Sequence, residues 1–274
     1  MPDALRSKVV SRPTLLTLGC SLSLAFCPCH QPPPIQESPV KSLLFLLPLV
    51  LVPSLHSLQD AKKVEVIDYD DGGYLFPVTR DAEGTPKDGK PTSTSLAGIG
   101  LREKTIFKVD VYTYGLYLDT EAAKKKLSQW KGKNKKALIE DKKLYEALLK
   151  DDMIKSIRLV FCRDVDGEDV EEAFSDSLEP RIKTAAKRKD WDNGTAALKK
   201  FRSYFGNLDE LEEYCEVVFT WRPGGELYTS VNGKAKPMLK SKSLCWALFD
   251  VYLGKDPIED DGKEDMISRL PKIL

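Results

Sequence analysis

The residue types available for chemistry in this 274-residue chain are few. Its two histidines, His30 and His56, both lie in the first 57 residues. If those residues form a leader, the remainder has no histidine to act as a general base or to ligate a metal. The phosphate-loop, Gly-x-Ser-x-Gly and HExxH sequences are absent as well. These absences exclude Ser-His-Asp or Cys-His nucleophilic sites and His-ligated metal sites from residues 58–274.

Cysteine chemistry is also unsupported. Residues 58–274 contain Cys162, Cys215 and Cys245, each in an apolar context and far apart in sequence. An odd number of cysteines without CxxC spacing argues against both a disulfide framework and a zinc site. We therefore predict buried thiols, no metal site and no cofactor.

An arginine and two tyrosines are the remaining candidates. The segment 105–118, TIFKVDVYTYGLYL, has the strongest strand pattern in the chain, and Arg102 lies just before it. Alternation assigns one face to the core, namely Phe107, Val109 and Val111. The opposite face is polar and aromatic and contains Lys108, Asp110, Tyr112 and Tyr114. Such a face is typical of a ligand cleft on a sheet, although a half-solvated sheet shows it more often.

Other short motifs are assigned to turns. Gly98-Ile99-Gly100 lacks the third glycine of a dinucleotide-binding loop and leads into a strand, so we predict a backbone turn. The carboxylate pairs Asp70-Asp71 and Asp260-Asp261 occur beside glycine and are predicted to be solvated turns. By itself, this inventory indicates only a domain with a cleft near Arg102 and Tyr112.

The elements that would position this cleft alternate between strands and helices. Strands are predicted at 63–67, 74–78, 154–163, 215–221 and 227–231, and helices at 121–131, 141–150, 196–205 and from Asp166 onward. Pro180 should kink or restart the helix that Asp166 caps. A last helix should begin at Ser241 or Ser243 and end at Gly254. Tight hairpins exclude an all-parallel sheet, so the fold class is α+β around an antiparallel sheet.

The first 57 residues differ from the rest. Basic residues at 6, 8 and 12 precede an apolar stretch at 15–27, and a second stretch at 43–55 contains two prolines. Both stretches are shorter than the ~20 residues of a membrane-spanning helix. We expect residues 1–57 to be a targeting leader, either a signal peptide or a two-part, plastid-like organelle presequence. The alternatives are a disordered tail and a start codon assigned too early. Residues 58–274 would then form one domain.

Charge excludes one class of partner. The chain has 42 basic and 42 acidic residues, with a sequence pI near 6.8. A nucleic-acid-binding protein normally carries a clustered basic excess, and this chain has none overall. We therefore expect no nucleic-acid partner and no stable membrane span in the mature domain.

Five sequence blocks resemble the chalcone isomerase family. They are Gly98-Ile99-Gly100-Leu101-Arg102 followed by FKVDVYTYGLYLD, then Gln129-Trp130-Lys131-Gly132-Lys133, RLVFCRDVDGEDVEEAF at 158–174, FTWRPGGELYTSVNG at 219–233 and SLCWALFDVYLGKDPI at 243–258. With these blocks in order, the resemblance extends over nearly all of residues 62–270. The resemblance implies an open-faced β-sandwich, in which helices back a large antiparallel sheet and a ligand cleft lies between them.

The resemblance also implies a set of site residues. Chalcone isomerases cyclise a chalcone to a flavanone, with an arginine that stabilises the phenolate, and polar residues around the cleft support it. The arginine matches Arg102. The other family positions, in the order threonine, lysine, tyrosine, asparagine and C-terminal threonine, fall on Tyr112, Phe161, Val170, Ser177 and Val251. Tyr114 is a further candidate on the same strand.

These replacements favour binding over catalysis. An arginine in an apolar cleft needs an anionic partner, which a fatty-acid carboxylate would supply, with Tyr112 donating alongside. Non-catalytic members of the family, which this sequence resembles in its arginine and tyrosine, bind fatty acids. The preferred hypothesis is therefore a non-catalytic binder of fatty acids or similar apolar carboxylates. The first alternative is an active chalcone–flavanone isomerase, an intramolecular lyase acting on a flavonoid precursor. The second is a structural or partner-binding domain in which Arg102 forms an internal salt bridge.

Overall fold

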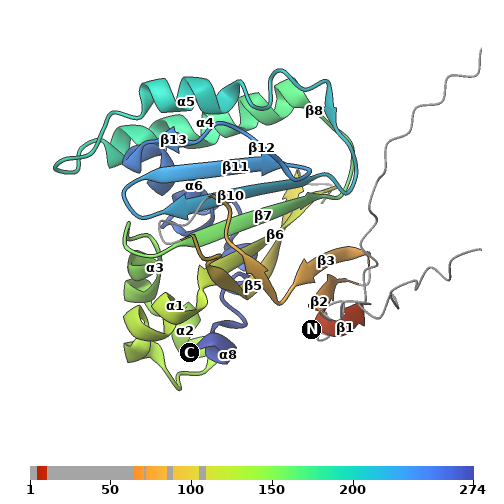
Figure 1. The fold of residues 1–274 in the computed structure, drawn as a ribbon, viewed down its shortest axis with the longest axis vertical. Helices are drawn as coiled ribbons and strands as arrows, with labels where there is room; N and C mark the ends of the chain where they lie inside the picture. Colours follow the sequence, from red (N-terminus) through yellow and green to blue (C-terminus); the bar gives the residue numbers. More distant parts are fainter. Residues whose placement is uncertain (1–4, 11–63, 71, 85–88, 105–108) are drawn as a thin grey trace, which may run out of the picture. The chain divides into compact units, whose positions relative to one another are not determined.

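A computed structural model describes residues 5–10, 64–70, 72–84, 89–104 and 109–274. Their main feature is an antiparallel sheet with strand order β12-β11-β10-β7-β6-β5-β4, in which β13 also pairs with β11. The strands are β4 (Thr79–Asp81), β5 (Ser93–Lys104), β6 (Val109–Asp119), β7 (Lys155–Phe161), β10 (Glu216–Arg222), β11 (Glu226–Val231), β12 (Lys234–Ala235) and β13 (Leu239–Lys240). The predicted α+β class with a large antiparallel sheet is confirmed (Figure 1).

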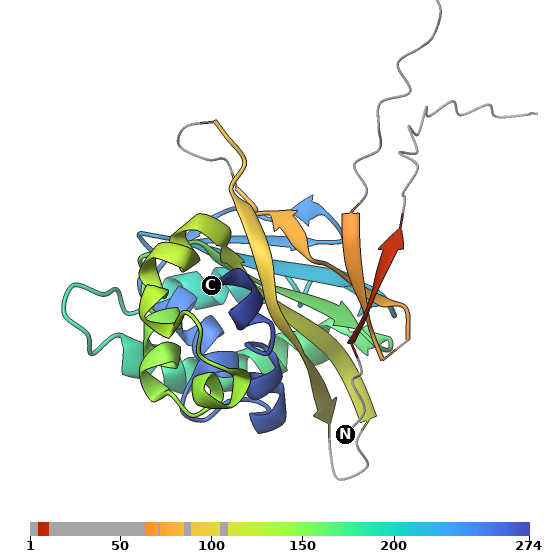
Figure 2. The same cartoon turned by 90° about the horizontal axis from the view of Figure 1, so that it is seen from below.

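Helices cover one face of this sheet, as the view in Figure 2 shows. They are α1 (Thr120–Lys126), η1 (Ser128–Trp130), α2 (Lys135–Ile139), α3 (Lys142–Leu148), α4 (Gly167–Ala185), α5 (Thr195–Arg202), α6 (Lys242–Leu253), α7 (Asp260–Asp265) and α8 (Leu270–Ile273). The main hydrophobic core lies between the two layers and includes Phe174, Phe219, Trp221 and Phe249. The apolar helix α6 is buried along almost its whole length, so it forms the centre of the helical layer.

A smaller layer packs on the opposite face of the sheet. Strand β2 (Val64–Tyr69) pairs with β3 (Tyr74–Pro77) and with β1 (Leu5–Val10). Ile67 and Phe76 pack against Leu96, Ile99 and Tyr117 of the large sheet and form a second core. A two-stranded ribbon of β8 (Val165–Asp166) and β9 (Glu210–Leu211) completes the strands. The predicted targeting leader lies outside the described residues except for β1, and it stays a prediction.

The glycine motif near residue 98 is not a turn, contrary to the prediction. Gly98 and Gly100 lie inside β5, opposite Leu116 and Tyr114 of β6. A Cβ atom on Gly98 would come within 2.0 Å of the Asp265 carbonyl oxygen, and one on Gly100 would also contact backbone of α7. Glycine is therefore required because the backbone of α7 approaches the strand closely.

The predicted faces of segment 105–118 also need correction. Phe107 and Lys108 lie outside the described residues, whereas Val109 is 39% exposed and does not belong to a core. Tyr114, assigned to the polar face, is fully buried in the main core. The side of β6 that carries Tyr112 and Tyr114 faces the helices, because the helical layer covers the side that the pattern suggested was half-solvated.

Helix ends follow the capping rules closely. The Asp166 side chain accepts from the Glu168 amide at 2.8 Å, and Ser241 accepts from the Leu244 amide at 3.0 Å. Gly254 ends α6 as predicted. Pro180 lies inside α4, which continues to Ala185, so the predicted restart of the helix is wrong, and the predicted kink stays a prediction.

The remaining negative predictions concern thiols, metals and membranes. Cys215 and Cys245 are buried, Cys162 is half-buried, and all three are free. Across the described ranges, no group of three or more His, Cys, Asp and Glu residues is placed to hold a metal ion. Nor does any helix in that part of the chain have the length and apolar character needed to cross a membrane.

Candidate ligand-binding cleft

Three neighbouring strands place the predicted arginine and two predicted neighbours in one row. Arg102 on β5 lies directly opposite Tyr112 on β6, and Tyr112 lies opposite Phe161 on β7. The register between β5 and β6 shifts immediately after Arg102. Such a bulge bends a strand and redirects its side chains. The row therefore forms the sheet side of a site at one end of these strands.

Helices α4 and α6 supply the opposite wall. Val170 and Ser177 are seven residues apart on α4 and share one face of that helix, while Val251 lies near the end of α6. Together with the strand row they line a cavity of about 520 Å³. This volume lies within the range of roughly 300–1,000 Å³ that is usual for small-molecule sites. Six of the seven predicted site residues thus surround one cavity.

Tyr114 is the exception. Its side chain is fully buried and does not line the cavity. Its ring packs against Tyr112 and Tyr252 at centroid distances of 5.9 Å and 4.9 Å. Its hydroxyl has no hydrogen-bond partner among the described residues, and burial raises its pKa far above the ordinary range. Tyr114 therefore supports the cavity wall from behind and is not placed to touch a ligand.

Arg102 already holds a carboxylate. Its Nη1 donates to the backbone oxygen of Ile258 at 2.9 Å and to the Glu259 side chain in a short ion pair. Both side chains are partly exposed, at 29% and 28%. The Glu259 side chain caps no backbone amide of α7, although it stands at the N-terminus of that helix. The arginine thus presents a carboxylate-binding site that an internal residue occupies at the cavity edge.

A pair of tyrosines continues the polar line from Arg102 into the molecule. The hydroxyl groups of Tyr112 and Tyr252 lie 3.3 Å apart. Burial raises the pKa of both phenols, so both are neutral near pH 7 and can donate hydrogen bonds. The Tyr112 ring also packs against Phe161 at 5.7 Å. An anion bound at Arg102 would therefore lie near a neutral hydroxyl donor.

Sequence reasoning missed several residues of the cleft. Glu259 and Tyr252 are the most consequential, because they contact Arg102 and Tyr112. Glu259 directly precedes the Asp260-Asp261 pair, which was considered only as a solvated turn. The mouth also has charged side chains that no motif indicated, namely Lys104, Arg163, Asp164, Asp166, Asp169 and Asp176. Only the density of acidic residues in 258–261 could have directed attention to this segment.

The arrangement suits binding better than proton transfer. The inner wall is apolar, because Phe161, Val170 and Val251 have hydrocarbon side chains. These three residues are 2%, 6% and 2% exposed. Beside this wall, the polar functions are the guanidinium at the cavity edge and two neutral phenols. Such a cavity can desolvate a hydrocarbon chain and hold an anionic head group at Arg102.

Comparisons with known proteins bear on this geometry. A family model described as "Chalcone isomerase like" matches residues 92–267. Fatty-acid-binding protein 1 of Arabidopsis thaliana is 27% identical over 180 residues, which are 64% of this chain and 63% of that protein. Chalcone isomerase-like protein 1 of Humulus lupulus is 28% identical over 191 residues, 68% of this chain and 82% of that protein. The chain thus spans slightly less than two thirds of the first of these relatives.

A solved structure has the same fold. The crystal structure of an Arabidopsis thaliana fatty-acid binding protein superposes with a TM-score of 0.60 at 23% sequence identity. The match covers 76% of this chain and 98% of that one. The predicted fold type, a large antiparallel sheet backed by helices, is therefore confirmed.

Proposed function

This chain belongs to the chalcone isomerase-like family, and on that premise we propose that it is a non-catalytic binder of fatty acids or similar apolar carboxylates. The observation that carries the proposal is the ion pair between Arg102 and Glu259 at the edge of the cavity. The guanidinium is already arranged around a carboxylate, and a ligand carboxylate can replace that of Glu259. The names of relatives such as fatty-acid-binding protein 1 support this ligand class.

The apolar wall supplies the affinity for the chain. Phe161 from β7, Val170 from α4 and Val251 from α6 present hydrocarbon to the cavity from three sides. Each methylene that moves from water into this wall contributes ~0.8 kcal/mol. The head group therefore sets orientation and selectivity for an anion, whereas chain length sets most of the affinity.

Isomerase activity would need polar help that these positions do not offer. The resemblance assigns two helper positions to Phe161 and Val170 and a flavonoid-contact position to Val251, and all three carry only hydrocarbon side chains. Tyr112 and Tyr252 can donate hydrogen bonds, but burial raises their pKa and disfavours the phenolate form. Arg102 alone would then have to stabilise a phenolate nucleophile while it is paired with Glu259.

One experiment compares the three hypotheses. The full chain is purified, bound lipid is extracted and identified by mass spectrometry, and chalcone cyclisation is assayed in parallel. Fatty acids recovered from the native protein and depleted in Arg102→Gln are expected, with Arg163→Gln as a control at the same cavity. Turnover above the spontaneous rate would establish an isomerase instead. If neither bound fatty acid nor turnover is detected, the structural or partner-binding role is the remaining hypothesis.

The compartment is a separate proposal. We propose that residues 1–57 direct the chain to an organelle or to the secretory pathway. Imaging of a fluorescent fusion, with and without these residues, tests it. Loss of organelle or secretory localisation on deletion is expected, and an unchanged distribution would refute it.

A further inference from the structure

A second pocket, of about 630 Å³, lies on another face of helix α6. Trp246, Asp250 and Leu253 recur along α6 at spacings of four and three residues and line this pocket, whereas Val251 and Tyr252 line the first cavity. The other walls come from α3, from the loop after it and from the segment that follows α4. The two sites therefore share a helix but no lining residue.

Arg188 is held in this pocket by stacking. Its guanidinium lies 3.9 Å from the ring centre of Trp246 and 4.6 Å from that of Trp191. Its side chain donates no hydrogen bond to any residue in the described part of the chain. The Arg188 side chain is exposed, and the partial desolvation beside the rings lowers the pKa of this guanidinium. The two indoles thus cover the apolar faces of an arginine that has no hydrogen-bond acceptor in the described part of the chain, and the charge of Asp250 acts on it from the same pocket.

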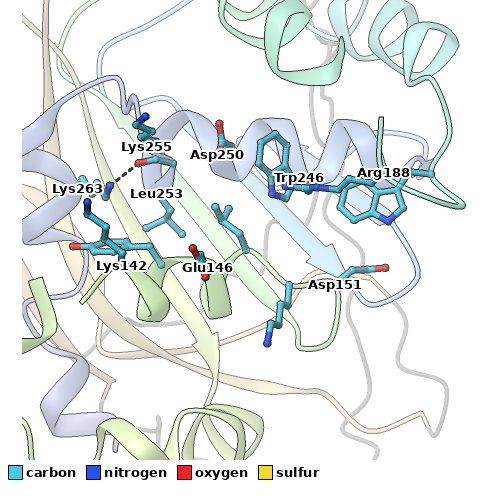
Figure 3. A pocket seen from close by; sticks show the side chains of 14 residues that line it. Lys142, Glu146, Asp151, Arg188, Trp246, Asp250, Leu253, Lys255 and Lys263 are labelled. Atoms are coloured by element: carbon cyan, nitrogen blue, oxygen red, sulfur yellow. Dashed lines mark hydrogen bonds between the residues drawn. The ribbon is translucent and has the colours of Figure 1, made fainter. Parts of the chain in front are cut away.

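The charge around Arg188 is also unbalanced. Figure 3 shows Lys142, Lys255 and Lys263 gathered at one end of the pocket, with Arg188 beside Trp246 at the other. Within the described residues, neither Lys142 nor Lys255 forms an ion pair. Lys150 on the rim forms none there either.

The carboxylates of the pocket are largely committed elsewhere. Asp151 accepts from the Trp221 indole at 2.8 Å and from the Gly224 amide at 2.9 Å. Asp250 pairs with Arg181 at 3.3 Å. Only Glu146 has no such partner among the described residues. The donors to Asp151 are neutral and leave its charge in place, so the pocket's cations without an ion pair among the described residues include Arg188, Lys142, Lys150 and Lys255, against Glu146 and Asp151. This surplus is more positive charge than a single carboxylate ligand would neutralise.

We propose that this pocket binds an organic phosphate, with the phosphate on the N–H edge of Arg188 and an apolar or aromatic body against Trp191 and Leu149, which are partly exposed in the lining. A guanidinium matches two phosphate oxygens at once, and a dianion suits the surplus of cations. The tryptophans supply flat apolar walls for the body. This site is independent of carboxylate binding at Arg102.

The test is titration of the full-length protein with phenyl phosphate, followed by calorimetry and indole fluorescence. Trp191 and Trp246 line the second pocket and no tryptophan lines the first cavity, so a change in indole emission favours binding in the second pocket. Phenyl phosphate should bind more tightly than inorganic phosphate, which has no body, and than benzoate, which has one charge. Equal affinities for the three, or no binding at millimolar phenyl phosphate, would overturn the proposal.

Variants locate the site. Arg188→Gln should weaken phenyl phosphate binding by about tenfold or more, the scale of a lost charge-assisted hydrogen bond. Lys189→Gln is the matched control, because it removes an exposed neighbouring charge outside the pocket and should change nothing. Thermal unfolding and fatty-acid binding verify that both variants are folded. Equal binding by Arg188→Gln and the native protein would refute the assignment.

A vesicle assay identifies the source of the phosphate. Sedimentation with phosphatidate vesicles, lost in Arg188→Gln, would identify a lipid head group as the natural ligand. Phenyl phosphate binding without sedimentation would identify a soluble phosphate ester. Both results support the site, because both require the phosphate to reach Arg188.

Discussion

Replacing Glu259 by glutamine should tighten fatty-acid binding. In the free protein Glu259 occupies the guanidinium of Arg102, so an incoming carboxylate must displace it. Both side chains are about 30% exposed, so solvent screens the ion pair. Its contribution to the free energy is therefore about 1–2 kcal/mol, between that of an exposed ion pair and that of a buried charged hydrogen bond. A glutamine of the same shape removes most of that competition and the repulsion between two carboxylates. The expected gain in affinity is about five- to thirtyfold.

Calorimetric titration of delipidated protein with a saturated fatty acid measures this gain. Asp260→Asn is the matched control, since it removes the same charge one residue further on and has no contact with Arg102. Glu259→Gln should also unfold at a slightly lower temperature than the native protein, because Arg102 loses its counterion. Unchanged or weaker binding in Glu259→Gln, or an equal gain in Asp260→Asn, would show that Arg102 is not the head-group site.

Three further predictions concern the cleft and the fold. Tyr112→Phe should weaken fatty-acid binding by about two- to tenfold through loss of a hydroxyl donor, as measured in the same titration, and an unchanged affinity would remove Tyr112 from the site. Gly98→Ala should lower the free energy of unfolding in urea by more than Gly132→Ala, for which about 1–2 kcal/mol is expected. A Cβ at residue 98 would collide with the backbone of Asp265, whereas one at residue 132 meets open space at positive φ. Equal losses in the two variants would contradict the close packing of α7. Lys155 is fully buried, and desolvation lowers its pKa from 10.5 to about 7. Between these two pH values the unfolded chain binds more protons than the native protein. Native stability should therefore rise with pH across that window, by up to about 1.4 kcal/mol per pH unit. Lys155→Met should lose this rise. Thermal melts of both proteins from pH 6 to 10 measure it, and parallel stability curves for the two proteins would contradict the prediction.

Much of the fold was predictable because its signals are local. Asp166, Ser241 and Gly254 mark helix ends through hydrogen bonds within one turn. The strand β5 was missed for the opposite reason. Its glycines lower strand propensity, and they are needed only because α7, more than 150 residues later, packs its backbone against them.

The residues of the cleft also divide into those that could be predicted from the sequence and those that could not. The strand row of Arg102, Tyr112 and Phe161 and the helix positions Val170 and Val251 were reached through the family resemblance, and the cavity contains them all. Their role in binding is still a prediction. Glu259 could not be found from sequence pattern, because its contact with Arg102 depends on how the chain returns to the sheet after α6. Tyr114 was misassigned because strand alternation does not show where a covering helix closes the cavity.

The proposed fatty-acid binding requires the ligand carboxylate to contact Arg102. The decisive measurement is the affinity of the native protein and of Arg102→Gln for a saturated fatty acid and for the alcohol of the same chain length. The native protein should bind the acid about tenfold or more tightly than the alcohol, and Arg102→Gln should bind both alike at the alcohol's affinity. A native protein that does not distinguish acid from alcohol, or a preference for the acid that survives in Arg102→Gln, would contradict the account.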